Sequence, residues 1–297
     1  MSNNLRGALW ILVAATCAAG MSLSIRGLEG GIPIFQIVFV RCVIGVALVI
    51  AFSARHGSIA VRSPQWKWLV VRSLMTTMAL LCGFHAISVL PLTTATVLFF
   101  TAPLYVTILS VPFFGETVGW RRGLATLMGF IGTIVVLRPG ITGYDPNMLF
   151  AIASSVLFAG VLLMGKRLSK TDTIGTMMFY AMVISGLGSL PMALTHWQTP
   201  VWQEWLLLLS VAGFGTLRGF GDTKGYAIGE ASVMAPFQYS RLVVVAIAAF
   251  FIFDEVPDGF TIAGAAIIIG SSLYIAHREA KLSKGTMGAP KTGVAAP

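Results

Sequence analysis

The sequence predicts an all-α polytopic membrane protein with ten transmembrane helices in two inverted five-helix repeats. Three observations lead to this fold class: the scarcity of charge, the length of the apolar runs and the uneven distribution of basic residues. Of 297 residues, 56% are hydrophobic and only 10% are charged, with 20 Lys and Arg against 11 Asp and Glu. A soluble domain has about 25% charged residues. The composition therefore excludes a soluble globular enzyme, a disordered chain and a disulfide scaffold.

Ten apolar segments are long enough to be transmembrane helices, because crossing the hydrocarbon core takes about 20 helical residues. Their length and the lack of alternating patterning exclude barrel strands, and helices satisfy the backbone in lipid. Turn formers such as Pro33, Pro91 and Pro139 lie at or between the segment ends. The predicted segments are 7–26, 33–53, 66–88, 91–112, 121–138, 148–166, 174–195, 204–227, 231–252 and 259–276.

The basic residues predict the orientation in the membrane. If the N-terminus is cytoplasmic, the inner loops and tails receive 15 of the 20 basic residues, and the outer loops receive only Arg26 and Arg138. Because Lys and Arg accumulate on the cytoplasmic side, we expect a multi-pass protein of the bacterial inner (cytoplasmic) membrane with both termini in the cytoplasm. Residues 277–297 are polar and rich in Gly, Lys and Pro, which predicts a disordered cytoplasmic tail.

Landmarks recur about 140 residues apart and divide the chain into halves. Glu116 and Glu255 each end an apolar segment and lie 139 positions apart. The predicted repeats are residues 7–138 and 148–276, each with five spans. Five is odd, so the second repeat must insert upside down relative to the first. Inverted repeats are typical of secondary transporters, which hold the substrate near the midplane and expose it alternately to each side.

Several motifs add a family resemblance. They are the run LPLTTATVLFFTAP at 90–103, the sequence FGE at 114–116 followed by Trp120, the sequence LRP at 137–139, and in the second half ASVMAP at 231–236 and DEVP at 254–257. With these motifs the chain resembles bacterial drug/metabolite transporters of the EamA type over residues 7–276. The resemblance implies an inner-membrane carrier of small organic solutes. Members of that family handle amino acids, nucleotide-like metabolites, vitamins such as riboflavin, and toxic compounds.

We therefore expect a secondary transporter of a small organic metabolite, and arginines within spans favour an amino acid or a related carboxylate-bearing solute. The alternative is a vitamin or nucleotide-like solute such as riboflavin or S-adenosylmethionine. A membrane-embedded enzyme is a more distant alternative, because the sequence has no HExxH motif, no paired acidic metal motif and no Ser/His/Asp set. We expect no cofactor, no metal and no nucleic-acid partner. The expected partners are the small-molecule substrate, membrane lipid and a coupling proton or counter-solute, with the protein a monomer or homodimer.

Five residues are predicted to bind substrate. A charged side chain at mid-span costs about 2.5–3.5 kcal/mol, so it usually faces a cavity or a partner. Arg41 lies within a span and suits a carboxylate or phosphate, the alternative being a structural arginine bonded to carbonyls at a helix end. Arg241 lies near mid-span and is expected to line the cavity, the alternative being a hydrogen-bond patch between helices. Gln238 and Tyr239 belong to the polar run before Arg241. Tyr105 follows a proline within its span, and the bend there would turn its hydroxyl toward a cavity.

Three further residues are predicted as a coupling site or gate. Arg218 and Asp222 stand four apart, on one helix face. They form either an ion pair near the cytoplasmic end or a proton-coupling gate. His85 titrates near neutral pH if it is exposed to solvent, the alternative being an interfacial position without function. Glu116 and Glu255 are expected to cap helix ends.

Overall fold

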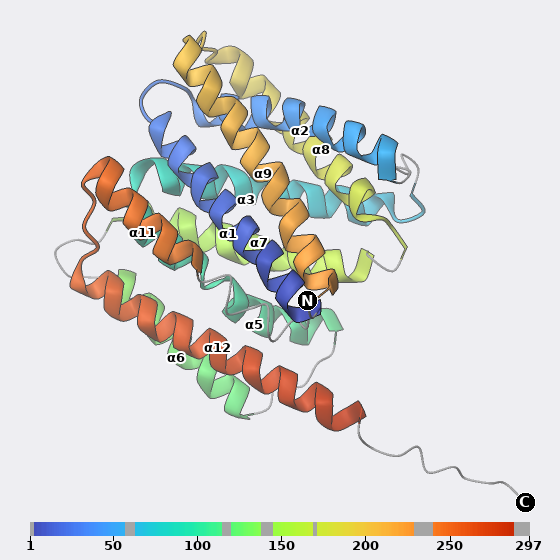
Figure 1. The fold of residues 1–297 in the computed structure, drawn as a ribbon, viewed down its shortest axis with the longest axis vertical. Helices are drawn as coiled ribbons and strands as arrows, with labels where there is room; N and C mark the ends of the chain where they lie inside the picture. Colours follow the sequence, from blue (N-terminus) through green and yellow to red (C-terminus); the bar gives the residue numbers. More distant parts are fainter. Residues whose placement is uncertain are drawn as a thin grey trace, which may run out of the picture.

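The computed structural model describes residues 3–56, 63–114, 120–137, 145–168, 171–228 and 240–287. Within these ranges all regular secondary structure is α-helical, which confirms the predicted fold class (Figure 1). The helices are α1 (Asn3–Gly27), α2 (Ile34–His56), α3 (Trp66–Val89), α4 (Leu92–Phe99), α5 (Ala102–Phe114), α6 (Trp120–Leu137), α7 (Met148–Leu168), α8 (Ile174–Thr195), α9 (Trp202–Ile228), α11 (Ser240–Phe253) and α12 (Gly259–Met287).

The outer surface of the bundle is apolar, as contact with lipid requires. Five helices, α1, α2, α3, α7 and α8, contain stretches long and apolar enough to cross a membrane. Shorter apolar stretches lie in α6, α11 and α12. On α6 the side chains of Leu124, Leu127 and Ile134 are more than half exposed. Patches of this kind on a soluble monomer would be an aggregation hazard. The full count of ten spans remains a prediction.

The packing of the helices repeats one pattern in both halves. In chain order the counterparts of α1, α2, α3 and α6 are α7, α8, α9 and α12. α1 packs along α9 and α7 packs along α3, while α2 packs on α8 and α6 packs on α12 (Figure 1). If each helix is replaced by its counterpart in the other half, the same four pairs result. Such a pattern is expected of two repeats related by a pseudo-two-fold axis.

The predicted span 91–112 is broken into α4 and α5. Around Phe100 and Thr101 the backbone amides bond three residues back instead of four, to Val97 and Leu98 at 3.1 Å each. The Thr101 hydroxyl also donates to the Leu98 carbonyl at 2.6 Å. Pro103 follows and has no amide hydrogen, so a continuous helix would lose a hydrogen bond at this point. The break lies in the middle of the bundle, where polar backbone needs protein around it.

The largest core cluster lies where α1, α2, α3 and α9 meet. It includes Met21, Ile25, Val38 and Phe84, all nearly inaccessible to solvent. Both halves contribute to it, so neither half encloses this core alone. Phe84 of this cluster lies beside Arg41, which is described below.

The predicted tail differs from the structure at its start. α12 continues to Met287, so the expectation of a disordered tail is wrong for residues 277–287, which are helical. The reason is local: the sequence REAKLSK at 278–284 consists largely of strong helix formers. Residues 288–297 lie outside the described part of the chain.

Candidate functional site

Arg41 is buried at the centre of the first half's contact with α9. Its side chain is 8% exposed, and its Nε has no hydrogen-bond partner among the described residues. The guanidinium lies 5.9 Å from the centroid of the Phe84 ring. Gly215 of α9 makes room for it, because a Cβ there would lie 2.9 Å from the Arg41 Nε. A buried cation with a free donor suits an incoming anion.

Arg241 is the second buried cation and comes from the other half of the chain. It lies at the start of α11, is 7% exposed, and donates from Nη2 to the Ser22 hydroxyl at 2.9 Å. Its guanidinium lies 5.8 Å from the centroid of the Phe99 ring. In the described structure its Nε also lacks a partner. Arg241 thus repeats the surroundings of Arg41: burial, an aromatic ring and one unused donor.

The structure brings the two arginines to the same turn of α1. Arg241 bonds to Ser22, and the space at Gly215 beside Arg41 is bordered by Met21, the neighbour of Ser22. Both arginines also lie within electrostatic range of Arg218 on α9. The predicted residues Arg41, Arg218 and Arg241 therefore form one positively charged region, although the sequence separates them by up to 200 positions.

Arg218 and Asp222 form the predicted ion pair. The Arg218 Nε lies 3.6 Å from the Asp222 Oδ2, and each side chain is a little over a quarter exposed. Asp222 also interacts electrostatically with Arg241. One carboxylate among three arginines leaves the region with a positive balance. Such a balance favours a solute that carries a carboxylate or phosphate.

The other predicted residues lie elsewhere or outside the description. Tyr105 packs edge-to-face on Phe130 of α6, with ring centroids 5.3 Å apart, and the described contacts do not join it to the arginines. His85 hydrogen-bonds from Nε2 to the Asn147 side chain at 3.1 Å, which ties α3 to the start of α7. Gln238 and Tyr239 lie outside the described residues, as does Glu116.

Three residues of the arginine region were not singled out from the sequence: Ser22, Phe84 and Phe99. Ser22 is fully buried and also bonds back to the Ala18 carbonyl at 3.0 Å, as serines in helices commonly do. The two rings belong to a set of 19 Phe that mostly follow the apolar pattern. Only the proximity of each ring to an arginine distinguishes it, and this proximity is a tertiary property.

A polar network centred on Arg26 and Glu255 joins the two halves at one end of the bundle. The Arg26 Nη2 donates to the Glu255 Oε1 at 3.0 Å, and its Nη1 donates to the Ser88 carbonyl. The other Glu255 oxygen accepts the Leu92 amide at the start of α4. Asp254, in the left-handed region with φ 53°, ends α11 just before Glu255. Glu255 thus caps a helix, as expected, but it caps α4 and also pairs with Arg26. We call this network the latch.

A second contact holds the same end. The Gln36 side chain at the start of α2 is fully buried, donates to the Gln198 carbonyl at 2.7 Å and accepts the Gln198 amide at 3.0 Å. These two bonds fix the segment before α9 to the first half. Together with the latch they connect the halves at the end where α1 finishes and α2 begins.

The side chains of the arginine region can bind a solute through charge, hydrogen bonds and apolar contact. Within the described ranges no group of three His, Cys, Asp or Glu is placed to hold a metal ion. The arginine region instead offers charge, free donors and aromatic surface. These are the properties of a binding site for an anionic or zwitterionic organic molecule with an apolar part.

Comparison with known proteins gives consistent matches over the whole chain. The model of the EamA-like transporter family matches residues 5–138 and 146–276. An S-adenosylmethionine uptake transporter of Rickettsia prowazekii (strain Madrid E) is 31% identical over 277 residues, which cover 93% of this chain and 94% of the relative. A riboflavin transporter of Vibrio cholerae serotype O1 is 30% identical over 285 residues, covering 94% of this chain and 96% of the relative. A solved structure with 22% identity has a TM-score of 0.65 and covers 95% of this chain and 98% of its own, which shows the same fold.

Proposed function

Because the chain belongs to the EamA-like transporter family, we propose that this membrane transporter carries a small metabolite that combines a carboxylate with a flat heteroaromatic ring. S-adenosylmethionine is the first candidate. Free amino acids were favoured from the sequence, but the names of the relatives favour the nucleotide-like or vitamin alternative. S-adenosylmethionine joins an amino-acid carboxylate, which suits the arginines, to an adenine ring, which suits the aromatic surface. Its ammonium and sulfonium groups make the whole molecule a cation, so only its carboxylate end matches the positive charge of the region.

The observation that carries the proposal is the pair of buried arginines with their rings. Arg41 and Arg241 each have an Nε without a partner among the described residues, and each guanidinium lies within 6 Å of a phenylalanine centroid. A carboxylate between the arginines would receive charge-assisted hydrogen bonds. Phe84 and Phe99 supply the apolar aromatic surface on which an adenine ring would pack.

Riboflavin is the second candidate, favoured by the name of the Vibrio cholerae relative and by the same aromatic surface. Its flavin ring has carbonyl oxygens that accept from guanidinium groups, but it has no carboxylate. The two candidates therefore differ in what they require of the arginines. Loss of one arginine charge should weaken a carboxylate-bearing solute more than riboflavin, since the carboxylate brings a full opposite charge to the guanidinium and the flavin carbonyl brings only a dipole.

The transport cycle that we propose is alternating access between the two repeats. In this structure the latch joins Arg26 of the first half to Glu255 of the second, so the end that it closes must open for solute to enter or leave there. With both termini in the cytoplasm of a bacterial inner-membrane protein, this closed end would face the periplasm. Asp222 is an acidic residue within electrostatic range of Arg241, so its protonation is our proposed route to coupling.

The test is binding and flux with purified protein. We expect S-adenosylmethionine to raise the melting temperature and to enter liposomes that contain the protein. Decarboxylated S-adenosylmethionine and methylthioadenosine keep the adenine ring but lack the carboxylate, so they should bind at least about tenfold more weakly. If neither S-adenosylmethionine nor riboflavin stabilises the protein or crosses the membrane, the proposed substrate class is wrong.

A variant pair locates the site and tests coupling. Arg241→Ala should remove S-adenosylmethionine uptake, while Arg167→Ala, at an exposed arginine on another helix, should leave it unchanged. Flux measured with and without a pH gradient, in wild type and in Asp222→Asn, distinguishes proton coupling from exchange. A gradient effect that persists in Asp222→Asn would remove Asp222 from the coupling step.

A further inference from the structure

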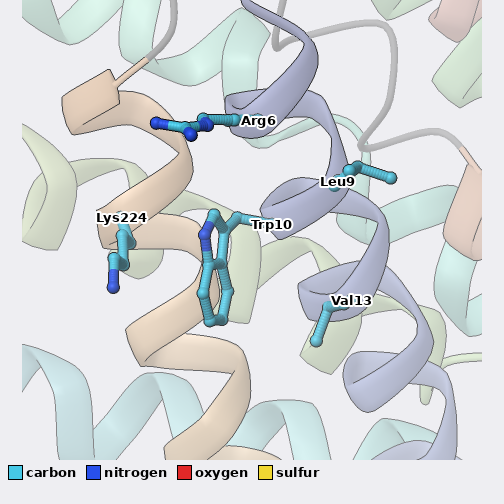
Figure 2. Close-up of a pocket in the computed structure, with 5 residues that line it drawn as sticks. All are labelled: Arg6, Leu9, Trp10, Val13 and Lys224. Atoms are coloured by element: carbon cyan, nitrogen blue, oxygen red, sulfur yellow. The ribbon is translucent and has the colours of Figure 1, made fainter. Parts of the chain in front are cut away.

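A groove lies between α1 and α9 (Figure 2). Its residues on α1 belong to the start of that helix, whereas the latch residue Arg26 lies at its end. Its volume is about 490 Å³, and it is lined by Arg6, Leu9, Trp10, Val13 and Lys224. Figure 2 shows four of these side chains coming from α1 and Lys224 coming from the neighbouring helix. The Trp10 indole lies between the two helices, below Arg6 in this view. The groove is separate from the arginine region described above.

Lys224 is held in place in the groove but not neutralised. The Lys224 ammonium lies 4.9 Å from the Trp10 centroid and 5.2 Å from the Phe220 centroid, and these two rings pack edge-to-face at 5.5 Å. Rings position a cation without cancelling its charge. Among the described ion pairs none includes Arg6 or Lys224. The groove therefore presents two free positive charges, one from each repeat.

The groove lies at the depth of a membrane surface. Arg6 and the latch residue Arg26 are both on α1, twenty residues apart. At 1.5 Å per residue this is about 30 Å, the thickness of the hydrocarbon core. When Arg26 is at one interface, Arg6 is at the other, and the positive-inside pattern assigns Arg6 to the cytoplasmic leaflet. Tryptophans such as Trp10 are enriched at this depth.

We propose that this groove binds an anionic phospholipid of the cytoplasmic leaflet. The phosphate would lie between Arg6 and Lys224, since basic pockets between transmembrane helices bind anionic headgroups. An acyl chain would follow Leu9 and Val13, which are 46% and 41% exposed on the same side of α1. A soluble anion has no use for this apolar continuation, so a lipid fits the groove better than a free phosphate. The lipid would bridge the two repeats at the end that the latch leaves free.

Native mass spectrometry of the detergent-purified protein tests the proposal with phosphatidylglycerol and phosphatidylcholine as probes. We expect phosphatidylglycerol to be retained and Arg6→Gln with Lys224→Gln to weaken its retention about 30-fold, or about fivefold for each cation. The matched control is Lys67→Gln with Arg167→Gln. This control also removes one lysine and one arginine charge from the predicted cytoplasmic side of the membrane. Like Lys224, each of its two cations lies over a tryptophan ring.

The result that overturns the proposal is equal retention by the two double variants, whether high or low, because diffuse surface charge would then explain the binding. Leu9→Ser adds a test that leaves the charges alone. It should lower phosphatidylglycerol retention, since the acyl chain loses apolar contact, and unchanged retention would contradict the lipid assignment. Competition by glycerol 1-phosphate at concentrations comparable to the lipid would also contradict it and would indicate a site for soluble anions.

Discussion

Glu255→Gln should open the end of the transporter that the latch closes. The Arg26 Nη2 lies 3.0 Å from the Glu255 Oε1, and the two side chains are 18% and 14% exposed. This exposure lies between that of a surface pair, worth about 0–1 kcal/mol, and a buried pair, whose rupture costs about 3–5 kcal/mol. Removing the charge should therefore shift the balance between closed and open forms by about 1–3 kcal/mol, which is about 5- to 150-fold.

Labelling of one buried cysteine measures that shift. Ser88 is 8% exposed beside the latch, and its neighbour Val89 is 40% exposed. In a background with the three native cysteines changed to alanine, Ser88→Cys should react with an impermeant maleimide at a rate set by opening. Glu255→Gln should raise that rate, while the rate at Val89→Cys should stay constant because Val89 is exposed already. Equal Ser88→Cys rates with and without Glu255→Gln would refute the latch.

Three other predictions concern the packing of α12, the contact at Gln36 and the hydroxyl beside Arg241. Gly264→Ala should lower the free energy of unfolding by about 1–3 kcal/mol, because the added Cβ would overlap the Val136 side chain of α6 and lie 2.8 Å from the Gly132 carbonyl oxygen. Gly270→Ala on the same helix meets nothing within 4 Å. In a thermal melt this second variant should behave like the wild type. Gln36→Leu removes two buried hydrogen bonds and should cost about 1–3 kcal/mol in a denaturant titration; an unchanged midpoint would show that this contact does not hold the halves. Ser22→Ala should weaken S-adenosylmethionine binding by about three- to tenfold, since it removes only the hydroxyl that positions the Arg241 guanidinium. Arg241→Ala should weaken binding much more. Equal losses of affinity in the two variants, measured by calorimetry, would contradict this prediction.

The elements that the sequence predicted well are those that a local pattern determines. The span 174–195 coincides with α8, and the span 66–88 differs from α3 by one residue. An apolar run of membrane length leaves few alternatives to a helix. The positions of Arg41 and Arg241 within spans were also visible, because an arginine stands out in an apolar run.

What the sequence could not provide was the set of partners. Phe84 and Phe99 are two of 19 Phe in a chain where phenylalanine also faces lipid, so no pattern marks them. Tyr105 was expected to face the substrate because a proline precedes it, but the helix ends and restarts there and its ring packs on α6. Glu255 was expected to cap a helix end, but its pairing with Arg26 depends on how the two repeats dock.

The latch also constrains the order in which the protein can be made. Its two charged residues are separated by 229 positions in the chain. At a synthesis rate of about 5–20 residues per second, Arg26 leaves the ribosome about 10 to 45 s before Glu255. During that interval α1 also lacks α9 and α11, on which it packs in the finished bundle. The first helix must therefore be inserted before its partners are made, and in a chain truncated before residue 255 Arg26 would keep only Glu29 as an ion-pair partner among the described residues.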